Sequence, residues 1–212
     1  MSEEQQNFSA EENLAFIRTV MDDAKRKTAN YGPWILLWGS LSSLATFGQY
    51  LGVRGVIDIR ITPLFWLAML VCGLLGTRYL AKKCAPVPVQ NSELINVNIK
   101  IWQGAGLAIF MYFVGKLGGL FLGTAEQFDH DFLALIAALM GTAFFATSYN
   151  SGLKWLKLVA FGWWAAVLLF VVNPLAEDDL LLIIAILDFL LIALPGYRLM
   201  VLHKALTSSS DL

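Results

Sequence analysis

Charged residues are scarce in this chain. Only 15% of its 212 residues are Asp, Glu, Lys or Arg, whereas 58% are hydrophobic and the mean hydropathy is +0.64. Soluble domains typically carry about 25% charged residues. A soluble domain of ordinary composition is therefore excluded, and the chain is predicted to be an all-α membrane protein with several spans.

Signatures of several other protein classes are also missing. A formal net charge of -1 gives no reason to expect nucleic acid as a partner. Cys72 and Cys84 fall in a predicted membrane helix and a predicted cytoplasmic loop, so no disulfide framework is expected. The first 32 residues lack the apolar core of a cleavable signal peptide. We therefore expect the first membrane helix to serve as the targeting signal.

Motifs for catalysis and cofactor binding are equally absent from the sequence. There is no paired metal-ligand motif, phosphate loop, nucleophile elbow or zincin motif, so no catalytic, cofactor-binding or metal-binding residues are predicted. Residues 126–131 place carboxylates beside His130, but a single histidine lacks the other ligands of a zinc site. We interpret these carboxylates as caps of the following helix.

Long hydrophobic runs account for most of the chain. A transmembrane helix needs about 20 consecutive, mostly apolar residues. Six stretches near that length predict a six-helix bundle: 33–53, 61–81, 101–122, 131–149, 155–175 and 180–201. Residues 1–32 then form an N-terminal segment and residues 202–212 a short tail.

Basic residues gather in alternate connections between these stretches. Twelve of the fifteen Lys and Arg lie in the N-terminal region, the 78–100 and 150–157 connections, and the C-terminal end. Arg54 and Arg60 fall on the other side. Because cytoplasmic loops are enriched in Lys and Arg, this pattern predicts that both termini lie in the cytoplasm.

Residues 9–30 predict an amphipathic helix that precedes the first span. Ser9 and Glu12 form a capping box at its start, and Gly32-Pro33 breaks the helix at its end. One narrow apolar face contains Leu14, Ile17, Met21 and Ala24. Residues 1–30 carry six acidic and four basic side chains, which is unlike a polybasic lipid anchor. We interpret the apolar face as a contact surface, either for the protein's own cytoplasmic loops or for a partner helix.

Two charged residues, Lys116 and Asp188, fall deep within predicted spans. Counted from the outer helix ends at about 1.5 Å per residue, Lys116 lies about 9 Å deep and Asp188 about 12 Å deep. Side chains lean towards the N-terminus of their helix, so on antiparallel helices these two lean towards each other. Unpaired charges are costly at that depth, which favours a Lys116–Asp188 pair over a snorkelling lysine and a protonated or hydrated carboxyl. The pair would act either as a clamp between spans three and six or as part of a path for a proton or small ion.

Small residues form two faces that suit close helix packing. They are Gly115, Gly119 and Gly123 on the third predicted span and Ala134, Ala138 and Gly141 on the fourth. Packing within one subunit and formation of a homo-oligomer both remain open. Pro195-Gly196, near the end of the sixth predicted span, predicts a kink.

The run Leu14-x-x-Ile17-Arg18-x-x-Met21-x-x-Ala24-Lys25, followed by Leu37-Trp38-Gly39, resembles a group of small uncharacterised bacterial inner-membrane proteins. In that group a cytoplasmic N-terminal helix leads into several spans. The resemblance covers this run and the hydropathy profile. It implies a bacterial cytoplasmic membrane as the location, and it implies no activity and no site residues.

These observations favour a non-enzymatic membrane protein that serves as a scaffold, sensor or accessory subunit. Residues 9–30 would then be its contact with a cytoplasmic or membrane protein. The alternative is a small transporter or channel that uses Lys116 and Asp188. An intramembrane enzyme ranks third, because buried Asp and Lys can perform acid–base chemistry.

Overall fold

Helices make up nearly all of the described chain. The computed structural model describes residues 10–83, 93–121, 130–172 and 177–208, and these ranges contain no strand. The elements are α1 (Ala10–Asn30), α2 (Gly32–Val53), the 3-10 turn η1 (Ile59–Ile61), α3 (Thr62–Lys83), α4 (Glu93–Phe121), α5 (His130–Ser151), α6 (Leu156–Val172), α7 (Glu177–Asp188), the π-helical turn η2 (Phe189–Ala193) and α8 (Leu194–Ser208). The prediction of an all-α fold is confirmed. Each of the six ranges predicted as spans contains a helix.

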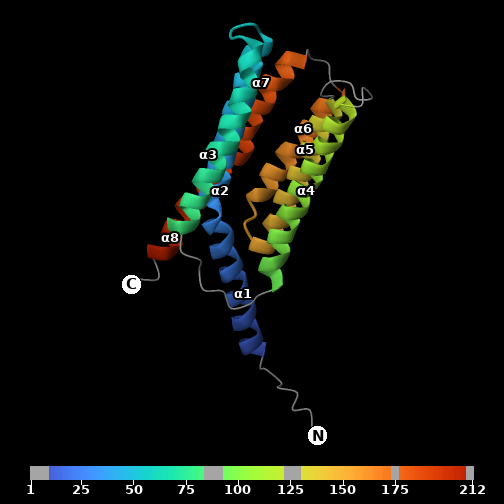
Figure 1. Cartoon of the computed structure of the whole chain (residues 1–212). Coiled ribbons are helices and arrows are strands. Elements are labelled where there is room, and N and C mark those ends of the chain that lie inside the picture. Colours follow the sequence, from blue (N-terminus) through green and yellow to red (C-terminus); the bar gives the residue numbers. More distant parts are fainter. Residues whose placement is uncertain (1–9, 84–92, 122–129, 173–176, 209–212) are drawn as a thin grey trace.

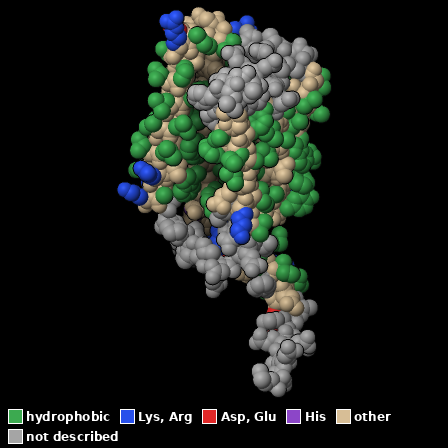
Figure 2. Space-filling model, turned by 45° about the vertical axis from the view of Figure 1, so that its right-hand side comes forward, with side chains coloured by type: hydrophobic (Ala, Val, Ile, Leu, Met, Phe, Trp, Pro, Cys, Tyr) green, Lys and Arg blue, Asp and Glu red, His purple; other side chains and the backbone are tan. Residues whose placement is uncertain are grey.

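Within the described ranges, three helical segments are long and apolar enough to cross a membrane. They are Ile59–Lys83, Phe132–Ser151 and Asp179–Ser208, and Leu156–Val172 is a shorter apolar helix. Hydrophobic side chains cover the length of the bundle in Figure 2, whereas Lys and Arg lie near its ends. A continuous apolar surface of this kind suits a lipid environment, which indicates a helical membrane protein with several passes.

The helices run side by side with alternating direction (Figure 1). α2 packs against α3 and against the continuous helix formed by α7, η2 and α8, while α5 packs against both α4 and α6. α1 and the end of α8 lie at one end of the bundle, and the turn between α2 and α3 lies at the other. An ion pair at that second end joins Arg54 to Asp179, with 2.6 Å between Nη2 and Oδ1. This arrangement agrees with the assignment of Arg54 and the start of the sixth predicted span to the same side.

The core lies between α5, α6 and the α7–α8 helix. Its largest fully buried side chains are Phe144, Leu156, Trp163, Phe170, Leu180 and Leu199. The small residues Ala137 and Ala160 are also fully buried there. Lipid tails are as apolar as these side chains, so close van der Waals packing holds such helices together rather than a hydrophobic effect.

Glycines allow α2 and α8 to meet backbone to backbone. A Cβ atom at Gly196 would overlap the backbone nitrogen of Leu36 and would lie 2.8 Å from the carbonyl carbon of Ile35. A Cβ atom at Gly32 would lie 2.8 Å from the carbonyl oxygen of Gly196. No residue larger than glycine fits at either position while the two helices keep their present separation.

A widened helical turn lies directly before Pro195-Gly196, where the sequence predicts a kink. Proline has no N–H group, and its ring clashes with the carbonyl four residues earlier, here that of Leu191. The turn before the proline is η2, in which the N–H of Leu194 donates to the carbonyl of Phe189. This five-residue step is the π-helical pattern, so the helix continues through the proline.

Candidate functional site

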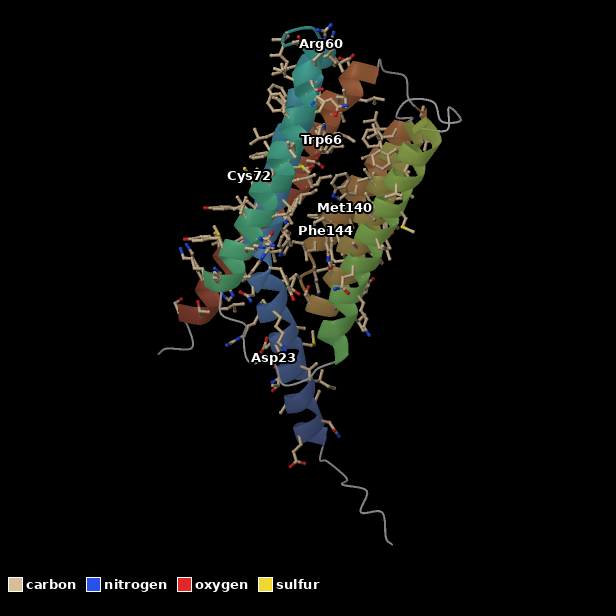
Figure 3. The ribbon with its side chains drawn as sticks, in the orientation of Figure 1. Asp23, Arg60, Trp66, Cys72, Met140 and Phe144 are labelled. Atoms are coloured by element: carbon tan, nitrogen blue, oxygen red, sulfur yellow. The ribbon has the colours of Figure 1, made fainter. Side chains whose placement is uncertain are left out.

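The N-terminal helix α1 divides into a docked half and a projecting half. Its C-terminal half packs against α8 and α5, and Ala24, Thr28 and Ala29 are buried there. Its N-terminal half extends beyond the bundle (Figure 1). Asp23 of α1, labelled in Figure 3, lies at the end of the molecule opposite Arg60.

The predicted apolar face of α1 is divided in the same way. Leu14, Ile17 and Met21 are 56%, 53% and 54% exposed, whereas Ala24 is 7% exposed. The spacing of the first three residues, i, i+3 and i+7, keeps them on one side of the helix. We call these three residues the apolar stripe. Ala24, the fourth member of the predicted face, is buried by the rest of the protein, whereas the apolar stripe stays more than half exposed.

Lys27 is a buried residue of α1 that the sequence analysis did not single out. It is 8% exposed, and its Nζ atom has no hydrogen-bond partner among the described residues. Lys27 lies three residues after Ala24 and so shares its face of the helix. This shared face was the one sign in the sequence that Lys27 is buried. A lysine on a helix outside the membrane is ordinarily exposed to water, so the sign is easily missed.

A cavity of about 450 Å³ separates α1 from the turn between α5 and α6. It is lined by Met21, Asp22 and Lys25 of α1 and by Ser151, Gly152, Leu153, Lys154 and Trp155 of the turn. Gly152 ends α5 with a φ of +67°, a left-handed conformation that favours glycine at a helix C-terminus. The turn is held locally, because the backbone N–H of Leu153 donates to Ser151 Oγ at 3.4 Å.

A second polar cluster surrounds Asp188 inside the bundle. Asp188 is 6% exposed, and Ser42 Oγ of α2 donates to its Oδ2 atom at 2.6 Å. Beside it, Ser43 Oγ donates to the carbonyl oxygen of Ala185 at 2.7 Å. The sequence predicted that Asp188 is buried and needs a partner, but it did not identify Ser42. The pair of adjacent serines in an apolar stretch was the signal for this contact.

The structure does not test the predicted Lys116–Asp188 pair. Lys116 belongs to α4, but its side chain lies outside the described residues. Helix α4 packs against α5, while α7 packs against α2. Asp188 meets Ser42 in this arrangement, and its pairing with Lys116 stays a prediction.

The predicted small-residue faces differ in their surroundings. Ala134 is buried, Ala138 is half-buried, and a Cβ atom at Gly141 would lie 2.5 Å from the ring of Trp164. No described heavy atom lies within 4 Å of a Cβ atom built at Gly115. The surroundings of Gly119 and all of Gly123 lie outside the described residues, so homo-oligomerisation through α4 stays a prediction.

No metal site emerges from the described residues. They contain no group of three or more His, Cys, Asp or Glu side chains that could hold an ion. Most of the 126–131 loop lies outside the described ranges, as does Cys84. Cys72 is an exposed free cysteine on α3.

Comparisons of this chain with family models, with curated proteins and with solved structures give no significant match. The resemblance to small bacterial inner-membrane proteins therefore stays a prediction, and any functional argument depends on the geometry of the protein itself.

Proposed function

We propose that this chain is a six-span protein of the bacterial cytoplasmic membrane that serves as a scaffold, sensor or accessory subunit. Helices in all six predicted ranges support the six spans, together with the position of α1 and α8 at one end of the bundle. The contact with its partner is the apolar stripe of α1. The resemblance noted in the sequence agrees with this location.

The main support for this partner contact is the exposure of the apolar stripe. Leu14, Ile17 and Met21 are each more than half exposed on a helix that projects from the bundle. A single exposed leucine is ordinary, but aligned apolar side chains at this spacing are the anchors with which a helix enters an apolar groove. The expected partner is a protein with such a groove, or an amphipathic helix that pairs with α1 along the stripe.

Site-specific photo-crosslinking in cells tests this contact. A photoreactive residue at position 17 should capture a defined partner protein, and Leu14→Ser with Met21→Ser should abolish the capture. The matched control, Thr19→Ser with Arg26→Ser, changes two exposed residues away from the stripe and should leave the capture intact. If the stripe variant captures the same protein as the unmodified chain, the contact role is refuted.

A second candidate function is a small transporter or channel, and the Asp188 cluster favours it. A buried carboxyl that accepts a hydrogen bond from Ser42 lies directly before a π-helical turn, a feature often found at functional sites. Reconstitution into liposomes would test it through proton and sodium flux. Transport should be lost in Asp188→Asn and retained in Asp179→Asn, which alters the exposed pair at the bundle end. Absence of flux in the unmodified protein would eliminate this function for those ions.

A further inference from the structure

The cavity between α1 and the α5–α6 turn has the features of a binding site for an anion. Lys25 and Lys154 both line it, and neither side chain has an ion pair or hydrogen bond with another described residue. Asp22 is the only carboxylate among the described residues that line it. Two ammonium groups against one carboxylate leave a positive surplus, which attracts an anion and repels a cation.

The aromatic side of the cavity carries a further positive charge. Trp155 lines it, and the guanidinium carbon of Arg198 in α8 lies 4.5 Å from the centre of the Trp155 ring. Stacking on the ring holds Arg198 beside the cavity without neutralising its charge. Three elements, α1, the α5–α6 turn and α8, thus bring basic groups to one place.

The size of the cavity limits the ligand further. About 450 Å³ falls within the range of roughly 300–1,000 Å³ typical of small-molecule sites, and it far exceeds the space that one inorganic ion needs. Met21, Leu153 and the indole of Trp155 supply apolar walls beside the lysines. The ligand must therefore combine an anionic group with an organic portion.

We infer that this cavity binds the phosphate group of an organic phosphate, with Lys25 and Lys154 as its ligands. Lysine is a common phosphate ligand and acts as a point charge on the phosphate oxygens. The same chemistry is offered by the phosphodiester of an acidic phospholipid headgroup and by a soluble phosphate monoester. This site goes beyond the proposed partner contact, and its occupancy can be measured on the purified chain alone.

Two binding experiments on the full chain in detergent separate these sources. Native mass spectrometry compares phosphatidylglycerol with diacylglycerol, which has the same tails but no phosphate. Isothermal titration calorimetry compares glycerol 3-phosphate with glycerol. Binding of phosphatidylglycerol alone identifies a lipid headgroup, and binding of glycerol 3-phosphate identifies a soluble phosphate ester.

Two double variants show whether phosphate binds in this cavity. Lys25→Gln with Lys154→Gln should weaken phosphate binding at least about tenfold, since each lost lysine removes a charge-assisted contact. Lys82→Gln with Lys83→Gln removes the same charge from exposed residues at the end of α3 and should change binding less than about twofold. Circular dichroism and gel filtration check that each variant is folded.

A third variant should change the phosphate affinity of the same site in the opposite direction. Asp22→Asn removes the carboxylate that the described lining contains and should strengthen binding several-fold. The proposal is overturned if neither phosphate ligand binds, if both lysine double variants weaken binding equally, or if Asp22→Asn weakens it.

Discussion

Substitution of Gly196 by alanine should separate α2 from α8. The new Cβ atom would overlap the backbone nitrogen of Leu36 and lie 2.8 Å from the carbonyl carbon of Ile35. Both neighbours are backbone atoms, which cannot rotate away as a side chain would. Because non-bonded carbon atoms sit about 3.5–4.0 Å apart, the helices must move apart by about 1 Å.

The size of the effect follows from that displacement. A gap of about 0.5–1 Å already loses a quarter to a half of the dispersion energy of each contact that it opens. Overpacking of this kind typically costs about 1–3 kcal/mol, and we expect Gly196→Ala near the upper end because its close contacts are all with backbone atoms. Gly104→Ala on α4 is the matched control, since no described atom lies within 4 Å of its Cβ position. That control should be neutral or more stable by up to about 1 kcal/mol, because alanine favours helix more than glycine does.

Unfolding in mixed micelles measures both variants. The fraction of sodium dodecyl sulfate that half-unfolds each protein can be followed by circular dichroism at a fixed detergent concentration. Gly196→Ala should unfold at clearly lower sodium dodecyl sulfate than the unmodified chain, and Gly104→Ala should not. Equal stability of the two variants would refute the claim that α2 and α8 meet backbone to backbone.

Three further substitutions test the buried polar groups. Lys27→Met should stabilise the protein by about 1–3 kcal/mol in the same unfolding assay, because it removes a buried amino group whose Nζ atom has no described partner. A loss of stability would show that the Lys27 side chain is paired. Ser42→Ala should destabilise by about 1–3 kcal/mol, since Asp188 Oδ2 loses its donor; an unchanged midpoint would contradict that bond. If Lys116 and Asp188 form a clamp, Lys116→Leu and Asp188→Leu should each lower stability while the double variant recovers it, and additive losses would exclude the pair.

The approximate positions of the helices could be predicted because they depend on local sequence. Runs of about 20 apolar residues mark six helical stretches, and Gly32-Pro33 marks the junction between α1 and α2. The ends are less well predicted, since α4 begins at Glu93 and α8 ends at Ser208. The structure places Pro33 in the first turn of α2, and one residue, Tyr31, separates the two helices. The sequence also predicted a kink at Pro195-Gly196. The structure has a π-helical turn directly before Pro195, and the kink itself stays a prediction.

Contacts between distant segments could not be predicted in the same way. The partner of Asp188 depends on which helix lies beside α7, and 146 residues separate Ser42 from Asp188 along the chain. Depth and side-chain lean pointed to Lys116 because only charged residues were considered as partners. The burial of Lys27 similarly depends on the docking of α1 against α5 and α8. Its spacing from Ala24 places it on the docked face, but the sequence of α1 does not show which helices cover that face.

The docked half of α1 fixes the position of its projecting half. Ala24, Thr28 and Ala29 are buried where α1 packs against α8 and α5, so the projecting part of the helix moves with that contact. Leu14 lies ten residues from Ala24, or about 15 Å along a helix, so a tilt of about 10° in the docked half would move Leu14 relative to Ala24 by about 3 Å. A small adjustment where α1 packs against α8 would in this way become a larger displacement at the surface where the partner is expected to bind.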